Sequence, residues 1–171
     1  EARAKAMGVD MRGGQPTPGN IAGGLTTIEE KSLGAIAKAG RAVVQEVYDY
    51  GETPQVPGLV VMDSPGREPE ILTGLAAAGC NVITFTTGRG APQGFPFVPV
   101  IKITGNEKTW NHLNDHIDLS VHQVMDGDES LASAGRRIYD AIENTSSGTK
   151  TKAEISGYVQ AMDIYVTGPV I

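Results

Sequence analysis

The sequence predicts an α/β domain with three layers and a mostly parallel, Rossmann-like sheet. Short, unbroken apolar runs alternate with helical patterns along the chain. The runs at 59–62 and 81–85 flank a helical segment, and a third run covers 97–103. Strands that are apolar on both faces are typical of parallel sheets, because the helices that connect such strands cover both sides.

The most regular helical pattern covers residues 25–39. Thr26 and Thr27 are candidate N-caps, and a glutamate follows each of them by three residues, which is the spacing of a capping box. Gly40 supplies the stop. The remaining expected elements are a strand at 42–48, a turn-rich connection at 52–57, helices at 68–78, 109–116, 128–144 and 152–158, and a last strand at 162–167.

Residues 8–24 are rich in glycine and proline, and we expect neither a helix nor a central strand there. Two interpretations stay open. The segment is a linker between domains, or it is an ordered loop that lies against a ligand. The second interpretation uses the polar side chains Arg12, Gln15, Thr17 and Asn20, which stand among the glycines.

Composition restricts the class of partner. The chain has 171 residues, 40% of them apolar, and a net charge of −6. No basic stripe is present for nucleic acid. No apolar run approaches the roughly 20 residues of a membrane span. Cys80, the single cysteine, fits a reducing compartment, so we expect the cytoplasm. We interpret Cys80 as a buried, inert thiol.

The most informative loop joins the second and third apolar runs. Residues 86–90, Thr-Thr-Gly-Arg-Gly, stand where the strand at 81–85 should end. Glycines let the backbone direct its N–H groups onto an oxyanion, and the planar fork of arginine fits a carboxylate. The loop therefore predicts a site for a small acidic metabolite.

A second loop points to the same edge of the sheet. Asp63, Ser64 and Pro65 follow the run at 59–62. The right-handed connection of a strand–helix–strand unit brings both loops to the edge where open α/β sheets bind ligands. The same three residues also fit a helix start, with a capping side chain and proline in the first turn.

Charged side chains at the start of the 25–39 helix are candidates for acid–base chemistry. Capping and the helix dipole explain a carboxylate at this place, so Glu29 or Glu30 has a purely structural interpretation. The other glutamate could bind a hard metal ion or move protons, and Lys31 could act as a base in a buried or cationic environment. His112 and His116 stand four residues apart, a spacing that can hold a metal, but a solvated polar helix is the simpler interpretation.

Four blocks of the chain resemble the sugar-acid dehydratase family that contains altronate and galactarate dehydratases. In chain order they are GNIAGGLTTIEEKSLGAIAKAG, GLVVMDSP, LTGLAAAGCNVITFTTGRGAPQG and VPVIKITGN. The sulfolactate sulfo-lyase large subunit belongs to the same family, and GAPQGFPFVPVIK and MDIYVTGPVI resemble that branch more closely. The resemblance covers residues 8–171. It implies that residues 25–171 form a single α/β C-terminal domain, and that residues 1–24 are a linker or ordered loop from an absent upstream domain.

The resemblance implies a lyase that removes the proton next to a carboxylate and expels hydroxide or sulfite. A divalent metal, Fe²⁺ or alternatively Mn²⁺, and preorganised donors would stabilise the enolate-like charge. The implied substrate-binding residues are polar or glycine: Asn20, Asp63, Ser64, Thr86, Thr87, Gly88, Arg89, Gly90 and Lys102. The implied catalytic candidates are Glu29, Glu30 and Lys31, with Glu30 also as a metal ligand.

The expected partners are a small hydroxy acid, the missing N-terminal and central domains or a small partner subunit, and further copies of the chain in a homo-oligomer. We expect no nucleic-acid or membrane partner, and little activity from the isolated domain. The alternative is a non-catalytic domain that dimerises the enzyme or binds a regulatory anion. Dinucleotide binding is disfavoured because Gly88-Arg89-Gly90 lacks the third glycine of the fingerprint, and Pro92 interrupts the helix that should follow.

Overall fold

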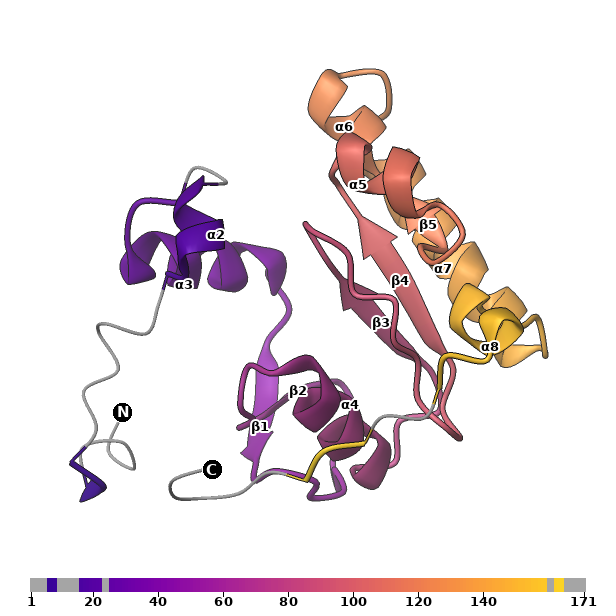
Figure 1. The fold of residues 1–171 in the computed structure, drawn as a ribbon. Coiled ribbons are helices and arrows are strands. Elements are labelled where there is room, and N and C mark those ends of the chain that lie inside the picture. The colour runs from indigo at the N-terminus through magenta and orange to yellow at the C-terminus, as the bar shows by residue number, and fades with distance from the viewer. Residues whose placement is uncertain (1–5, 9–15, 23–24, 160–161, 165–171) are drawn as a thin grey trace. The chain divides into compact units, whose positions relative to one another are not determined.

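The computed structural model describes residues 6–8, 16–22, 25–159 and 162–164. The chain forms two compact units, one made of Glu1–Gln45 with Val166–Ile171 and the other of Glu46–Tyr165. Figure 1 shows the ribbon. The predicted boundary after residue 24 concerns the domains of a longer protein and stays a prediction.

The first unit contains the helices α2 (Pro18–Ala22) and α3 (Ile28–Lys38). Thr27 caps α3, because its side chain accepts a hydrogen bond from the Glu30 N–H at 3.2 Å. Gly40 has a φ of 73° just beyond the end of α3, a conformation that glycine adopts without strain. The predicted helix at 25–39 is therefore confirmed, with its first turn at Ile28.

The presence of α2 corrects the expectation that residues 8–24 contain no helix. Pro18 opens this helix, where proline is tolerated because the first N–H has no intrahelical partner. Thr17 and Asn20 cap it reciprocally. The Thr17 N–H donates to Asn20 Oδ1 at 3.2 Å, and the Asn20 N–H donates to Thr17 Oγ1 at 3.3 Å. Side-chain capping thus outweighs the surrounding helix breakers.

The second unit contains both helices and parallel strands, which confirms the predicted α/β class. The chain enters this unit within β1. The elements are β1 (Val44–Tyr48), β2 (Leu59–Met62), α4 (Glu68–Ala77), β3 (Ile83–Thr86), β4 (Val100–Thr104), α5 (Glu107–Leu113), β5 (Leu119–Ser120), α6 (His122–Asp126), α7 (Leu131–Ser146) and α8 (Lys152–Ser156). Among the described residues, no helix has the length and apolar character needed to cross a membrane.

Strand pairing differs from the predicted strand–helix–strand unit around α4. A two-stranded sheet joins β1 and β2, and a separate parallel sheet has the order β3-β4-β5. Hence β2 and β3 are not neighbours in one sheet, and the parallel unit with a helical connection is β4–α5–β5. An apolar run identifies a strand but does not specify its partner, because pairing depends on contacts that are distant in the sequence.

Several element boundaries also differ. The helix expected at 128–144 is α7, which begins at Leu131 and ends at Ser146, and the preceding helix α6, which Gly127 ends with a φ of 84°, was not predicted. The strand expected at 97–103 begins only at Val100. Residues 162–164 of the expected last strand have no regular structure, and residues 165–167 lie outside the described part.

The core of the second unit lies between α4 and the parallel sheet. Leu72 of α4 packs with Ile83 of β3 and Val100 of β4, and the connection between these strands adds Phe95 and Val98. Every residue of β4 is buried, as expected for the central strand of a parallel sheet.

A buried ion pair ties β4 to α4. Lys102 of β4 has no exposed surface, and its Nζ lies 2.7 Å from Oε1 of Glu68, the first residue of α4. The same ammonium lies 4.9 Å from the centre of the Phe85 ring on β3. Burial lowers the pKa of Lys102, whereas the hydrogen bond and charge of Glu68, with the charge of Asp118, act to raise it. Asp118 also accepts hydrogen bonds from the backbone N–H groups of Lys102 and Lys152, at 2.7 and 2.8 Å.

We expect Glu68→Gln to lower the free energy of unfolding by roughly 3 kcal/mol, because it leaves a buried ammonium without its counter-charge. Lys102→Met should cost less, since it keeps an apolar stem of similar length and leaves a carboxylate that is partly solvated. Asp140→Asn, in the exposed Arg136–Asp140 pair, is the control and should change stability by less than about 0.5 kcal/mol. Urea unfolding measures all three. Equal effects of Glu68→Gln and Asp140→Asn would contradict a structural role for the buried pair.

Candidate functional site

The Thr-Thr-Gly-Arg-Gly loop leaves β3 and is held by its own hydrogen bonds. The Thr87 N–H donates to the Ile103 carbonyl at 2.9 Å, which continues the contact between β3 and β4. The Gly90 N–H donates to Thr87 Oγ1 at 3.1 Å. This bond already occupies the Gly90 N–H. In this conformation of the loop, and contrary to our expectation, the Gly90 N–H is therefore not available to bind an oxyanion of a ligand.

Gly90 is the position where this loop requires glycine. Its φ is 104°, which side chains rarely adopt. A Cβ atom at Gly90 would also overlap Cδ1 of Leu113 on α5. The loop therefore lies directly against α5.

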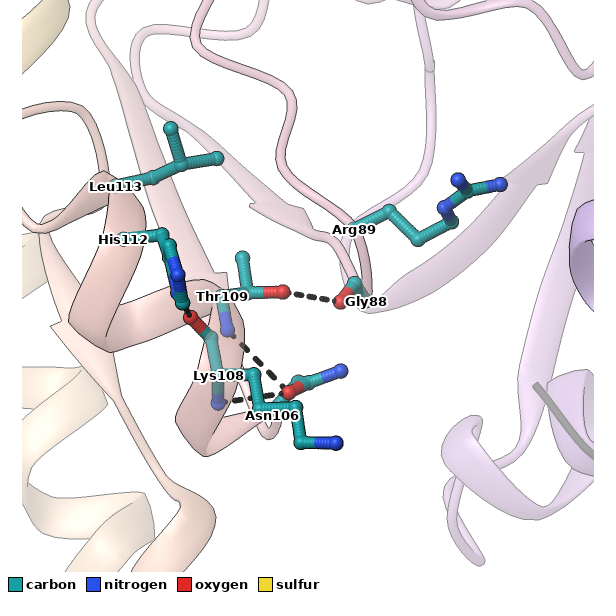
Figure 2. A pocket seen from close by; sticks show the side chains of 7 residues that line it. All are labelled: Gly88, Arg89, Asn106, Lys108, Thr109, His112 and Leu113. Atoms are coloured by element: carbon teal, nitrogen blue, oxygen red, sulfur yellow. Dashed lines mark hydrogen bonds between the residues drawn. The ribbon is translucent and has the colours of Figure 1, made fainter.

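An open hollow of about 310 Å³ lies where the loop meets α5, and we call it the Gly88 hollow. Figure 2 shows the seven residues that line it: Gly88, Arg89, Asn106, Lys108, Thr109, His112 and Leu113. Thr109 Oγ1 donates to the Gly88 carbonyl at 2.6 Å and fixes the loop to the helix. The hollow is lined by three groups that are or can become cationic, and by no carboxylate.

Hydrogen bonds within α5 determine which atoms of its side chains remain for a ligand. Asn106 Oδ1 caps the helix by accepting from the N–H groups of Lys108 and Thr109, at 2.9 and 3.3 Å. His112 Nδ1 lies 2.7 Å from the Lys108 carbonyl. Because a carbonyl oxygen can only accept, Nδ1 carries the hydrogen and Nε2 is the nitrogen left for other chemistry.

Arg89 occupies the other side of the loop from these helix residues. Figure 2 shows its side chain extending from the loop away from α5. The residue is exposed, and no described residue pairs with its guanidinium. It is therefore accessible to an anion in solution, and its role as a carboxylate ligand stays a prediction.

Asp63 and Ser64 do not line the Gly88 hollow. Ser64 Oγ donates to the Pro65 carbonyl at 3.1 Å, and the Asp63 N–H donates to the Tyr48 carbonyl at 2.8 Å. The alternative that these residues cap the following helix is wrong, because the N-cap of α4 is Arg67, which makes no side-chain cap bond. A substrate-binding role for Asp63 and Ser64 stays a prediction.

The other predicted substrate-binding residues of the second unit have different surroundings. Lys102 is fully buried and paired with Glu68, so its side chain does not line the hollow. Thr86 is exposed at the end of β3. The Thr87 hydroxyl accepts from Gly90 and keeps its own proton for a further partner.

The predicted residues of the first unit form their own cluster. Lys31 Nζ donates to Asn20 Oδ1 at 3.1 Å, which joins α3 to α2. Glu30 Oε2 accepts the Thr26 N–H at 2.8 Å and also the Thr26 hydroxyl. These two bonds hold the pKa of Glu30 below its ordinary value, and the bond from the hydroxyl has the larger effect. The structural interpretation of Glu30 as a residue of the helix start is thus confirmed, while Glu29 is exposed in the same turn.

No cluster of three or more potential metal ligands occurs among the described residues. The suggested pair His112 and His116 does not change this. His112 is held by the Lys108 carbonyl, and the buried Nδ1 of His116 has no hydrogen-bond partner.

The sequence did not lead us to the residues that α5 and its N-cap contribute to the hollow, which are Asn106, Lys108, Thr109 and His112. Of these, only His112 was considered, and only as a metal ligand. A signal was available. The run that becomes β4 is followed by Gly105 and Asn106, and the carboxyl ends of parallel neighbours share one edge of a sheet. The same rule that identified the loop after β3 therefore also identifies the segment after β4.

Comparisons with known proteins agree with one another. A family model described as "D-galactarate/Altronate dehydratase, C-terminal" matches residues 1–169. Similar curated proteins include the (2R)-sulfolactate sulfo-lyase subunit beta of Chromohalobacter salexigens, 43% identical over 150 residues, and the altronate dehydratase of Escherichia coli, 40% identical over 136 residues. The galactarate dehydratase (L-threo-forming) of E. coli is 36% identical over 144 residues.

These alignments cover most of the chain but a minor part of each relative. They include 87%, 80% and 84% of this chain, against 39%, 27% and 28% of the three relatives. The chain therefore spans less than two-fifths of the length of these relatives.

We expect Gly90→Ala to destabilise the second unit by about 1–3 kcal/mol, because alanine is strained at this φ and its Cβ would displace Leu113. Gly88→Ala is the matched control. It places a Cβ where no other atom lies within 4 Å, and should change stability by less than about 0.5 kcal/mol. Thermal unfolding compares the two. Equal stability of both variants would show that the loop does not pack on α5 in this way.

Proposed function

The chain belongs to the family of D-galactarate/altronate dehydratase C-terminal domains, and from this premise we propose that it forms part of a lyase acting on a small hydroxy acid. The reaction is the loss of water from a sugar acid such as altronate or galactarate, or the loss of sulfite from sulfolactate. The rest of the enzyme, as further domains or as a small partner subunit, lies outside this chain. We propose a homo-oligomer in the cytoplasm.

One observation carries the proposal. The Gly88 hollow contains Arg89, Lys108 and His112 and no carboxylate, although the whole chain has a net charge of −6. A local excess of positive charge on an acidic protein favours binding of a small anion. Hydroxy acids are such anions.

The reaction itself requires a held carboxylate. A base removes the proton from the carbon beside the carboxylate, the electron pair forms a carbon–carbon double bond, and hydroxide or sulfite leaves from the next carbon with its bonding pair. The resulting enol becomes the 2-keto acid. Negative charge grows on the carboxylate during proton removal. A guanidinium bound to the carboxylate therefore stabilises the transition state more than the ground state. We assign this task to Arg89.

The remaining roles go to residues whose hydrogen bonds leave an atom available. Thr87 can donate its hydroxyl proton to a substrate oxygen, and Thr86 is exposed beside it. We propose that the proton-removing group is one of the three charged residues at the start of α3, Glu29, Glu30 or Lys31. The bonds from Thr26 favour the ionised form of Glu30, and an ionised carboxylate is the form that accepts a proton or binds a metal.

We also propose that the enzyme uses a divalent metal, Fe²⁺ or alternatively Mn²⁺. Glu30 suits one position in such a site, because both Thr26 bonds go to Oε2 and Oε1 stays available. The other ligands would come from outside the described residues, which hold no cluster of three potential ligands. When bound, the metal would act as a Lewis acid on oxygens of the substrate.

Arg89→Ala in the full-length protein should lower kcat/KM for its hydroxy acid by about 10²–10³-fold, the usual loss for one transition-state donor. Arg136→Ala, on the exposed face of α7, is the control and should leave kcat/KM unchanged. The assay follows 2-keto acid formation from altronate, galactarate and 3-sulfolactate, with sulfite release measured separately.

Wild-type turnover by the Arg89→Ala variant would remove Arg89 from the mechanism. Anion binding by the wild type without turnover of any of the three acids would favour the alternative, a non-catalytic anion-binding domain.

Removal of bound metal with a chelator should abolish turnover, and added Fe²⁺ should restore it, if the enolate-like charge needs a Lewis acid. Glu30→Gln should lower the amount of iron that the full-length protein retains, measured by elemental analysis, because it removes one anionic ligand. Glu29→Gln is its neighbour control. Full turnover after complete metal removal would contradict the metal requirement.

A further inference from the structure

We propose that Thr109 of α5 is a positioning residue for Arg89. Its hydroxyl holds the peptide group that precedes Arg89, and this bond helps to set the direction in which the arginine side chain leaves the loop. The inference rests on the proposed function, because it concerns the guanidinium to which we assign the substrate carboxylate. Thr109 acts through Arg89 and has no contact with the substrate in this role.

Both peptide groups that flank Arg89 are held by a threonine hydroxyl. The Gly88 carbonyl, in the peptide group before Arg89, accepts from Thr109 Oγ1 at 2.6 Å. The Gly90 N–H, in the peptide group after it, donates to Thr87 Oγ1 at 3.1 Å. Because each peptide group is planar, holding the two groups restricts the φ and ψ angles of Arg89. These angles determine the direction of its Cα–Cβ bond.

Arg89 depends on such bonds because its own side chain is not packed. The residue is exposed, and a glycine on each side gives the backbone more conformational freedom than other residues would. Hydrogen bonds to the neighbouring peptide groups therefore define the direction of the side chain. Figure 2 shows the arrangement, in which the Gly88 carbonyl is held on the α5 side and the Arg89 side chain extends away from α5.

Thr109 is well placed to hold the loop. It is only 8% exposed, and its N–H donates to the capping side chain of Asn106 at 3.3 Å. The helix that carries it follows β4, in which every residue is buried. The second holding residue, Thr87, is bonded through its N–H to the Ile103 carbonyl of the same strand, at 2.9 Å. Both bonds around Arg89 thus connect it to the central strand of the parallel sheet.

The test is a double-mutant cycle in the full-length protein, assayed with the hydroxy acid that it turns over. Thr109→Val keeps the methyl group and removes the hydroxyl, whereas Thr109→Ser keeps the hydroxyl and removes the methyl group. We expect Thr109→Val to lower kcat/KM by about tenfold or more, because a small misplacement of a substrate-binding group costs this much. Thr109→Ser should stay close to the wild-type value. In an Arg89→Ala background, Thr109→Val should cause little further loss, since the side chain that it positions is absent.

Thr73→Val is the matched control. The Thr73 hydroxyl also donates to a backbone carbonyl, that of Pro69 at 2.8 Å, but it lies on α4 and does not line the Gly88 hollow. Its removal should leave kcat/KM unchanged. Thermal unfolding of each variant shows that the assayed protein is folded.

Three results would overturn the positioning role while the assignment of Arg89 stands. They are wild-type kcat/KM in Thr109→Val, an equal loss in Thr109→Ser, and a loss from Thr109→Val that is as large in the Arg89→Ala background as in the wild type. Wild-type turnover by Arg89→Ala itself would remove the proposed role of Arg89, and this inference with it.

Discussion

The second unit depends on one buried charge and the carboxylate that faces it. Lys102 is the largest fully buried side chain of the described residues, and an ammonium without a counter-charge would be strongly disfavoured there. Glu68 supplies that counter-charge from the first residue of α4, and the Phe85 ring offers its face to the same ammonium. One side chain of the central strand therefore fixes the start of a helix and the end of the neighbouring strand. The loop that begins after Thr86 starts from this fixed point.

The hollow follows from the parallel pairing of β3 and β4. Their carboxyl ends lie at one edge, so the loop after β3 and the helix after β4 meet there. The contact is specific, since the Gly88 carbonyl accepts from the Thr109 hydroxyl and any Cβ at Gly90 would displace Leu113. Arg89, Lys108 and His112 come together at this edge, and no carboxylate lines the hollow with them.

Patterns within a few residues were sufficient to predict local structure. The cap at Thr27, the stop at Gly40 and the buried strand that contains Lys102 are all readable from the sequence. Two kinds of information were not. Strand partners could not be predicted because β2 and β3 have similar apolar patterns but belong to different sheets. The Lys102–Glu68 pair and the Thr109–Gly88 bond join residues 34 and 21 positions apart, and neither spacing has a signature in sequence. The α5 side of the hollow was missed for a different reason, because the rule that places ligands at the carboxyl ends of parallel strands was applied to the segment after β3 and not to the segment after β4.

These separations also bear on the folding kinetics of the second unit. Asp118 joins β4 to the start of α8, 34 residues later in the sequence, and Arg67 reaches Asp163 across 96 residues. The chain must close loops of this length before such contacts form. Its conformational entropy is therefore lost before the contacts can offset that loss. Chains rich in distant parallel pairings fold slowly compared with helical bundles. During synthesis, the strand that contains Lys102 emerges before the α8 residue that bonds Asp118, so completion of this unit waits until Lys152 and Asp163 have left the ribosome.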